Sequence, residues 1–269
     1  MNERYAHMFA QLKERGEGAF IPFVMLGDPT LDVCQKAMDV LVQSGADALE
    51  LGIPFSDPVA DGAVIQRAGV RALSAGVTPD DCFALIKRLR ARYPHLPIGL
   101  LVYANIVIHR GLEDFYQRAY DSGADSVLIA DLSIKESAPF IAAAQKAKIA
   151  PVFVAPPNAD DDTLSHVARL SQGYVYFLGR VGVTGADRAM QMPASPKLQT
   201  LRDHHSAPIV IGFGISTPEH VKTAMAAGAD GAISGSAIVK IMEEHLSDAN
   251  AMSQALAAFV RSMKAATKS

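Results

Sequence analysis

Three carboxylates that could do chemistry lie within and just after one apolar segment, residues 46–53, which also contains Asp47 near its start. Glu50 lies inside the segment, and Asp57 and Asp61 follow it in a loop with the sequence PFSDPVADG. If the segment is a β-strand, its side chains alternate between two faces, so Glu50 lies on the face opposite the leucines on either side of it. A carboxyl group on a buried face is partly desolvated, which raises its pKa towards the range that suits a general acid or base.

Glu50 and Asp61 each have a purely structural interpretation as well. Glu50 could form an ion pair with a cation on a neighbouring strand, but the apolar segments of this chain contain neither lysine nor arginine. Asp61 precedes Gly62 and an amphipathic stretch, so it is also a candidate helix N-cap. The residue types favour acid–base chemistry for Glu50 and leave both roles open for Asp61.

Glycine-rich loops follow three of the apolar segments near the end of the chain. They cover residues 182–185, 212–216 and 234–239. Glycine lets backbone N–H groups approach an anion closely, and Ser236 is placed where an N-cap hydroxyl would help. Any one of these loops suits an ordinary tight turn, but three in succession predict a phosphorylated substrate.

Apolar and aromatic residues end several of the same segments. Singly, most such residues only fill a core, but together at one rim they would form a pocket for a flat apolar group. The histidines show no metal-ligand spacing and no GxGxxG follows the first segment, so metal-dependent and nicotinamide chemistry are disfavoured. The pocket candidates are Phe23, Leu101, Tyr103, Leu128, Ala130, Val154 and Tyr176.

The elements that must position these residues alternate regularly. Short apolar segments bounded by turn residues predict buried parallel strands, and amphipathic stretches between them predict crossover helices. The predicted strands are residues 20–26, 46–53, 98–103, 126–130, 151–155, 174–178, 208–212 and 231–234. The predicted helices include residues 31–43, 79–92, 112–122, 134–146, 160–170, 218–227 and 251–266.

A Gly-Ala-Asp motif recurs at residues 45–47, 123–125 and 228–230, each time between a predicted helix and an even-numbered strand. Alternate strands of an eight-stranded barrel are equivalent, so this parity favours a closed barrel over a doubly wound sheet. We therefore expect an α/β fold: a single (β/α)8 TIM barrel over residues 1–269, with an extra N-terminal helix and a short phosphate-binding helix after strand 8.

Composition excludes several other classes of protein. The chain has 25 basic and 28 acidic residues, a net charge of −3, and 49% hydrophobic residues. This balance argues against a disordered chain, and against nucleic acid or a membrane surface as the main partner. A charged N-terminus, only two cysteines and no apolar run of the roughly 18 residues that span a bilayer predict a cytoplasmic protein.

Several motifs together resemble the tryptophan synthase α-subunit family. The most specific is LELGIPFSDP at residues 49–58, followed by Ala-Asp-Gly at 60–62. Similar motifs cover residues 23–29, 103–105, 156–158, 180–185, 212–216 and 235–239, so the resemblance extends over essentially the whole chain in order.

This resemblance implies a (β/α)8 barrel that cleaves indole-3-glycerol phosphate to indole and glyceraldehyde 3-phosphate by a retro-aldol reaction. It implies no cofactor in this chain. The expected partner is a tryptophan synthase β subunit, which holds pyridoxal phosphate, in an α2β2 heterotetramer.

Residue by residue, Glu50 and Asp61 match the catalytic glutamate and aspartate of the family. Asp57 matches a position that signals to the β subunit, and residues 179–193 match a loop that closes over substrate. Ala63 stands where the family usually has proline, and Met25 where it often has threonine. The expected substrate-binding positions are Phe23, Leu101, Tyr176, Thr184, Gly185, Gly214, Gly235 and Ser236.

Two other functions are compatible with a barrel of this kind. One is a regulatory subunit whose main effect is to activate a partner enzyme. The other keeps the phosphorylated substrate but changes the chemistry, to ring-closing indole-glycerol-phosphate synthesis or sugar-phosphate isomerisation. Such reactions generally use a lysine at a strand end, and the predicted strands contain none.

Overall fold

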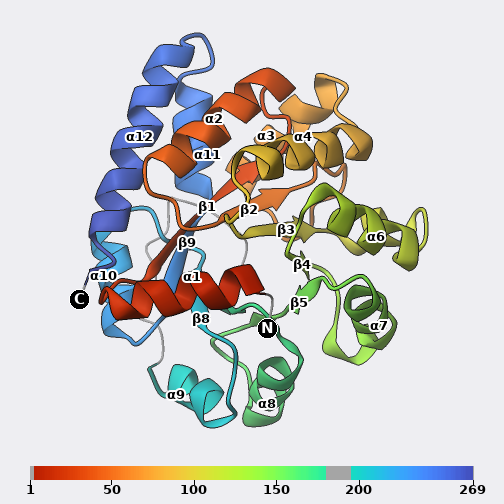
Figure 1. Cartoon of the computed structure of the whole chain (residues 1–269), viewed down its shortest axis with the longest axis vertical. Helices are drawn as coiled ribbons and strands as arrows, with labels where there is room; N and C mark the ends of the chain where they lie inside the picture. The colour runs from red at the N-terminus through yellow and green to blue at the C-terminus, as the bar shows by residue number, and fades with distance from the viewer. Residues whose placement is uncertain (1–2, 180–194, 269) are drawn as a thin grey trace.

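The computed structural model describes residues 3–179 and 195–268, whose strands and helices alternate along the chain (Figure 1). All of the strands are parallel and belong to one sheet. They are β1 (Ala19–Met25), β2 (Leu49–Gly52), β3 (Ile98–Val102), β4 (Ser126–Ile129), β5 (Ala150–Val152), β6 (Val154–Ala155), β7 (Val175–Leu178), β8 (Ile209–Gly212) and β9 (Gly231–Ser234).

The sheet closes into a barrel. β1 pairs with both β2 and β9, β5 pairs with β4, and β6 pairs with β7. Only Phe153 separates β5 from β6, so these two short strands together occupy the place of the single strand predicted for residues 151–155. The eight predicted strands and the TIM-barrel fold are confirmed, with this one interruption.

Helices surround the barrel, and α1 lies across one end of it (Figure 1). The predictions for 31–43, 79–92 and 112–122 are confirmed, whereas the helix predicted for 134–146 is interrupted at Ser137. Pro139 has no N–H with which to continue a helix from that side. The helices are α1 (Glu3–Glu14), α2 (Leu31–Gln43), α3 (Ala63–Ser74), α4 (Pro79–Arg92), α5 (Ala104–Ile108), α6 (Leu112–Ser122), η1 (Ile134–Glu136), α7 (Ala138–Lys146), α8 (Asp161–Leu170), α9 (Ser195–Asp203), α10 (Pro218–Ala226), α11 (Ser236–Glu244) and α12 (Ala249–Ala265).

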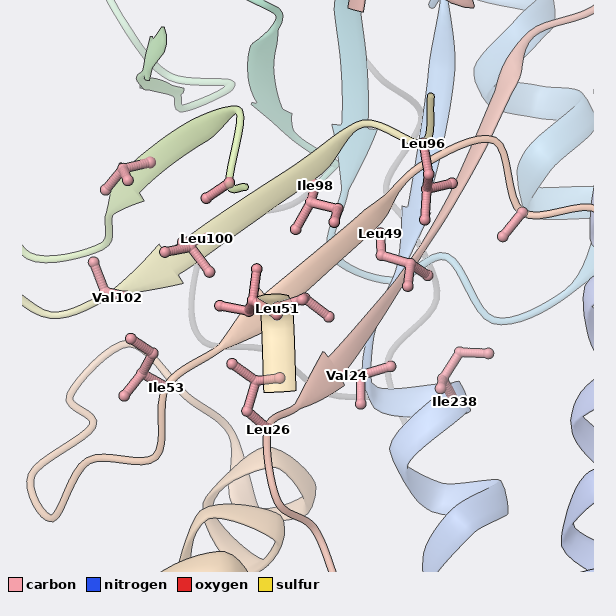
Figure 2. Close-up of a cluster of buried hydrophobic side chains, with 14 of the residues drawn as sticks. Val24, Leu26, Leu49, Leu51, Ile53, Leu96, Ile98, Leu100, Val102 and Ile238 are labelled. Carbon is pink, nitrogen blue, oxygen red and sulfur yellow. The ribbon is translucent and has the colours of Figure 1, made fainter. Parts of the chain in front are cut away.

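Side-chain alternation separates an outer core from the barrel interior. Leu49 and Leu51 of β2 lie in the outer cluster beneath the helices, together with residues of β1 and β3 (Figure 2). Ala48 belongs to the interior cluster, which Tyr5 and Leu12 of α1 close from below. Because residues two apart share a face, this arrangement places Glu50 inside the barrel as predicted.

The three Gly-Ala-Asp motifs serve one structural purpose. Each glycine ends a helix at positive φ, and each aspartate accepts a hydrogen bond from the backbone N–H at the start of the neighbouring strand. A cation then pairs with each carboxylate, so the motif ties together the N-terminal ends of adjacent strands. The bonds, each 2.8 Å long, join Phe20 N to Asp47, Ile98 N to Asp125 and Ile209 N to Asp230.

Candidate active site

Glu50 is the most deeply buried carboxylate of the site, with 1% of its surface exposed. The Tyr174 hydroxyl, on the residue just before β7, donates a hydrogen bond of 3.0 Å to Glu50 Oε1. Burial raises the pKa of Glu50 to about 8, although the tyrosine bond works in the opposite direction. Among the residues that the structure describes, no cation pairs with Glu50, so the ion-pair alternative finds no support there.

Asp61 lies in the loop between β2 and α3, with 7% of its surface exposed. Burial raises the pKa of its carboxyl group to about 6, against a hydrogen bond from the Tyr103 hydroxyl that lowers it. The same hydroxyl accepts the Ala60 N–H at 3.2 Å, and the Tyr103 ring stacks on Phe55 with centroids 5.3 Å apart. Tyr103 therefore fixes the position of the loop that carries Asp61.

The N-cap alternative for Asp61 is wrong. The N-cap of α3 is Gly62, and the helix starts at Ala63. The backbone carbonyl of Asp61 instead accepts a hydrogen bond of 2.7 Å from the Gln66 side chain. This contact uses the main chain, so the carboxylate is left for the cavity that it lines.

Both carboxylates line one cavity at the C-terminal ends of the strands. The predicted residues Phe23, Leu101 and Tyr176 form apolar walls of this cavity. By contrast, Leu128, Ala130 and Val154 pack in or against the barrel-interior cluster and do not line this cavity. The cavity thus offers a flat apolar group a place beside two carboxyl groups.

A second wall of the cavity is built from backbone. Gly214, at φ +80°, lies on one side, and Gly235 and Ser236, at the start of α11, lie on the other. The first N–H groups of a helix have no partner within it, and the helix dipole is positive there, so this wall suits a phosphate. The predicted short helix after the last strand is confirmed. The N-cap role predicted for Ser236 is wrong, because Gly235 is the cap and Ser236 is the first helical residue.

Other predicted positions lie elsewhere. Thr184 and Gly185, together with the closing loop that includes them, lie outside the described residues apart from Gly179. Asp57 is exposed on the same loop as Asp61, where its carboxylate interacts with the Ser56 hydroxyl and does not line the cavity.

Structure also reveals residues of the site that the sequence did not single out. Tyr174 is 124 positions from the carboxylate that it contacts, and no local pattern marks it. Ile65 of α3 and Phe213 add apolar surface to the cavity. Phe213 has positive φ, at +67°, and lies inside the Gly-Phe-Gly loop. Its place in this loop was the one feature of the sequence that pointed to Phe213 as a residue of the site.

Neither a metal site nor a membrane span is found in the part of the chain that the structure describes. No three histidine, cysteine, aspartate or glutamate side chains there come together as metal ligands. None of the described helices is long and apolar enough to cross a membrane.

The two carboxyl groups of the cavity differ in a way that suits acid–base catalysis. With pKa values of about 8 and about 6, Glu50 is mainly protonated and Asp61 mainly ionised at pH 7. One cavity thus holds a protonated carboxyl group and an ionised one, beside an apolar wall and a wall that suits a phosphate. Such a pair suits acid–base cleavage of a phosphorylated substrate that carries a flat apolar group.

Comparison with known proteins agrees with this chemistry. The sequence pattern of the family described as "Tryptophan synthase alpha chain" matches residues 9–268. The chain belongs to this family. Tryptophan synthase alpha chains from Escherichia coli (strain K12 / DH10B) and Shigella sonnei are each 54% identical to it over 267 residues, which are 99% of this chain and 100% of each relative.

Solved structures show the same barrel. Tryptophan synthase subunit alpha from Legionella pneumophila has a TM-score of 0.89 at 31% identity, covering 99% of this chain and 98% of that one. A chain of tryptophan synthase from Mycobacterium tuberculosis has a TM-score of 0.89 at 26% identity, with both chains fully covered.

Membership of this family settles the reaction. The protein is an indole-3-glycerol-phosphate lyase of tryptophan biosynthesis, which forms indole and glyceraldehyde 3-phosphate. The α-subunit reaction needs no cofactor, since pyridoxal phosphate belongs to the β subunit. Both alternative barrel reactions, synthesis of the indole compound and sugar-phosphate isomerisation, are thereby set aside.

Proposed function

We propose that Glu50 and Asp61 carry out the cleavage of indole-3-glycerol phosphate. Protonated Glu50 gives its proton to C3 of the indole ring, which becomes a cationic indolenine. Asp61, as a carboxylate, accepts a hydrogen bond from the ring N–H and stabilises the positive charge. The Glu50 carboxylate then takes the proton of the side-chain hydroxyl as the carbon–carbon bond breaks.

This sequence of steps balances without an external group. The hydroxyl oxygen becomes the aldehyde oxygen of glyceraldehyde 3-phosphate, and the electrons of the broken bond return to the ring, which leaves as indole. Glu50 ends the cycle protonated, as it began. The observation that carries the proposal is that Glu50 and Asp61 line one cavity, where burial raises the pKa of Glu50 to about 8 and that of Asp61 to about 6.

The rest of the cavity supports specific binding roles. The indole ring would lie against Phe23, Leu101 and Tyr176, because these residues form the apolar walls of the cavity. Backbone N–H groups at Gly214, Gly235 and Ser236 would bind the phosphate. Thr184 and Gly185 are proposed as further substrate contacts on the family resemblance alone.

Partnership with a β subunit is also a proposal. A solved structure similar to this chain, with a TM-score of 0.82 and 32% identity, is of a tryptophan synthase α2β2 complex from Pyrococcus furiosus. We infer the same α2β2 assembly here, with pyridoxal phosphate only in the β subunit. Asp57 is exposed on the loop between β2 and α3, which also carries Asp61. A partner that contacts Asp57 would therefore influence the position of Asp61 through this loop. A cytoplasmic location and a single domain over residues 1–269 stay predictions.

Indole release from indole-3-glycerol phosphate, measured with and without a purified β subunit, tests the assignment. We expect turnover by the chain alone, and a Glu50→Gln variant should fold and lose it. Glu113→Gln is the matched control, because Glu113 is exposed and its ion pair with Lys146 lies on the surface. Near-normal turnover by Glu50→Gln would refute the mechanism. Activity only in the presence of the β subunit would show that cleavage by this chain depends on activation by its partner.

A further inference from the structure

Arg71, in the last turn of α3, forms ion pairs with two other parts of the molecule. Its Nε and Nη2 donate to the two carboxylate oxygens of Asp28 at 2.7 and 2.9 Å. Its Nη1 donates to Glu243 Oε1, near the end of α11, at 2.7 Å. One planar guanidinium group therefore joins three segments, and each of its bonds is short and charge-assisted.

Burial gives these bonds weight. The Asp28 side chain is 1% exposed, and those of Arg71 and Glu243 are 20% and 23% exposed. Burial raises the pKa of Asp28 even though Arg71 opposes the rise, whereas Arg67 and Arg71 together lower the pKa of Glu243 to about 2. An unpaired charge at Asp28 would be costly, so the three side chains are strongly tied to one geometry.

Each joined segment leads directly to a wall of the active-site cavity. Asp28 follows β1, which carries Phe23 of the indole wall. The α3 helix begins just after Asp61, and its Ile65 lines the cavity. The α11 helix begins at the phosphate wall and ends at the glutamate that Arg71 binds.

We propose that Arg71 is a positioning residue that sets the spacing between the phosphate-binding start of α11 and the catalytic pair Glu50 and Asp61. The inference rests on the roles proposed for those residues. The ring and the phosphate of indole-3-glycerol phosphate are joined by a three-carbon chain of limited reach, so one molecule must meet both walls at once. Separate indole and glycerol 3-phosphate molecules have no such requirement, since each needs only its own wall.

This difference gives a readout that a merely structural role would not change. In Arg71→Met, kcat/KM for indole-3-glycerol phosphate should fall about ten- to a hundredfold, since misplacement by about 1 Å costs up to roughly that much. Dissociation constants for indole alone and for glycerol 3-phosphate alone, measured by NMR titration of the full chain, should change less than about threefold. Arg71→Lys should recover only part of the loss, because lysine has no planar fork with which to bridge both carboxylates.

Arg118→Met is the matched control, because Arg118 is a similarly buried arginine whose ion pair joins α6 to Asp80 of α4, away from the cavity. It should keep kcat/KM within about twofold of the parent. If Arg71→Met does not fold, Arg71→Lys and Glu243→Gln carry the same comparison of whole substrate with fragments.

Two results would overturn the proposal: unchanged kcat/KM in a folded Arg71 variant, or an equal loss of affinity for glycerol 3-phosphate alone. These readouts are separate from the test of the catalytic roles. The fragment affinities do not depend on proton transfer, whereas the Glu50→Gln experiment depends on it entirely.

Discussion

Replacing Tyr174 with phenylalanine should raise the pKa of Glu50 and shift the alkaline limit of activity with it. The tyrosine hydroxyl donates to Glu50 Oε1 at 3.0 Å, and this bond favours the ionised carboxylate. A hydrogen bond to a charged group contributes about 1.5–3 kcal/mol, and one pKa unit corresponds to about 1.4 kcal/mol. Losing the bond should therefore raise the pKa by about one to two units.

The sign of the effect on activity follows from the proposed roles. Glu50 acts first in its protonated form, so kcat/KM should fall as the pH rises through about 8. Asp61 acts as a carboxylate, so kcat/KM should also fall as the pH drops through about 6. In Tyr174→Phe the alkaline limit should move above about pH 9, while the acid limit stays in place.

The assay is indole release from indole-3-glycerol phosphate across the pH range, for the parent and the variant. Ionisation of the substrate phosphate is the same for both proteins, so it cancels in the comparison. A ¹³C-glutamate NMR titration, with the Glu50 signal identified by its absence in Glu50→Gln, gives the pKa of the free protein directly. Tyr116→Phe is the control, because it removes another buried tyrosine hydroxyl, on α6 outside the barrel.

An alkaline limit that stays in place, or moves to lower pH, would refute this reasoning. Either result would mean that the Tyr174 hydroxyl does not stabilise the ionised form of Glu50 in the working enzyme. A shift of both limits together would instead indicate a general change in the cavity.

Three further predictions concern stability. In the folded protein Glu50 keeps a proton that the unfolded chain releases above about pH 4.5, so Glu50 destabilises the fold increasingly as the pH rises towards 8. Glu50→Gln should therefore raise Tm more at pH 8 than at pH 5. An equal gain in Tm at both pH values would contradict the raised pKa of Glu50. Asp125→Asn should lower the free energy of unfolding, measured by urea denaturation, by about 3 kcal/mol, because the half-buried Arg90 loses its charged partner. Asp80→Asn is the control: its ion pair is exposed, so the midpoint of the urea transition should stay almost unchanged. Ala63→Pro should raise the free energy of unfolding by about 0.4–1 kcal/mol. Ala63 is the first residue of α3, a position that accepts proline, and Gly62, at ψ 168°, has a backbone conformation compatible with a following proline. A lowered Tm would show that the local backbone is not suited to proline.

Local pattern was enough to predict most of the barrel. Alternation along residues 46–53 placed Glu50 on the inner face, and the recurring glycines marked the loops of the phosphate wall. The helix bounds 31–43, 79–92 and 112–122 followed from amphipathic stretches and from turn and capping residues. The errors in helix bounds and caps, at Ser137, in the N-cap alternative for Asp61 and in the N-cap role of Ser236, are one or two positions in size, because neighbouring residues compete for the same local role. The pocket candidates Leu128, Ala130 and Val154 were wrong for another reason, since sequence does not show which strand-end residues face the cavity.

The amino-acid sequence by itself determined the fold class, the two carboxylates and the family, because periodicity and motif are properties of consecutive residues. Only the tertiary structure decided how these parts work together. Tyr174 comes to Glu50, Tyr103 to Asp61, and Arg71 to Asp28 and Glu243 from distant parts of the chain. Burial, which sets the pKa values of Glu50 and Asp61, is likewise a property of the closed barrel and not of any segment, because it depends on which strands and helices surround each carboxyl group.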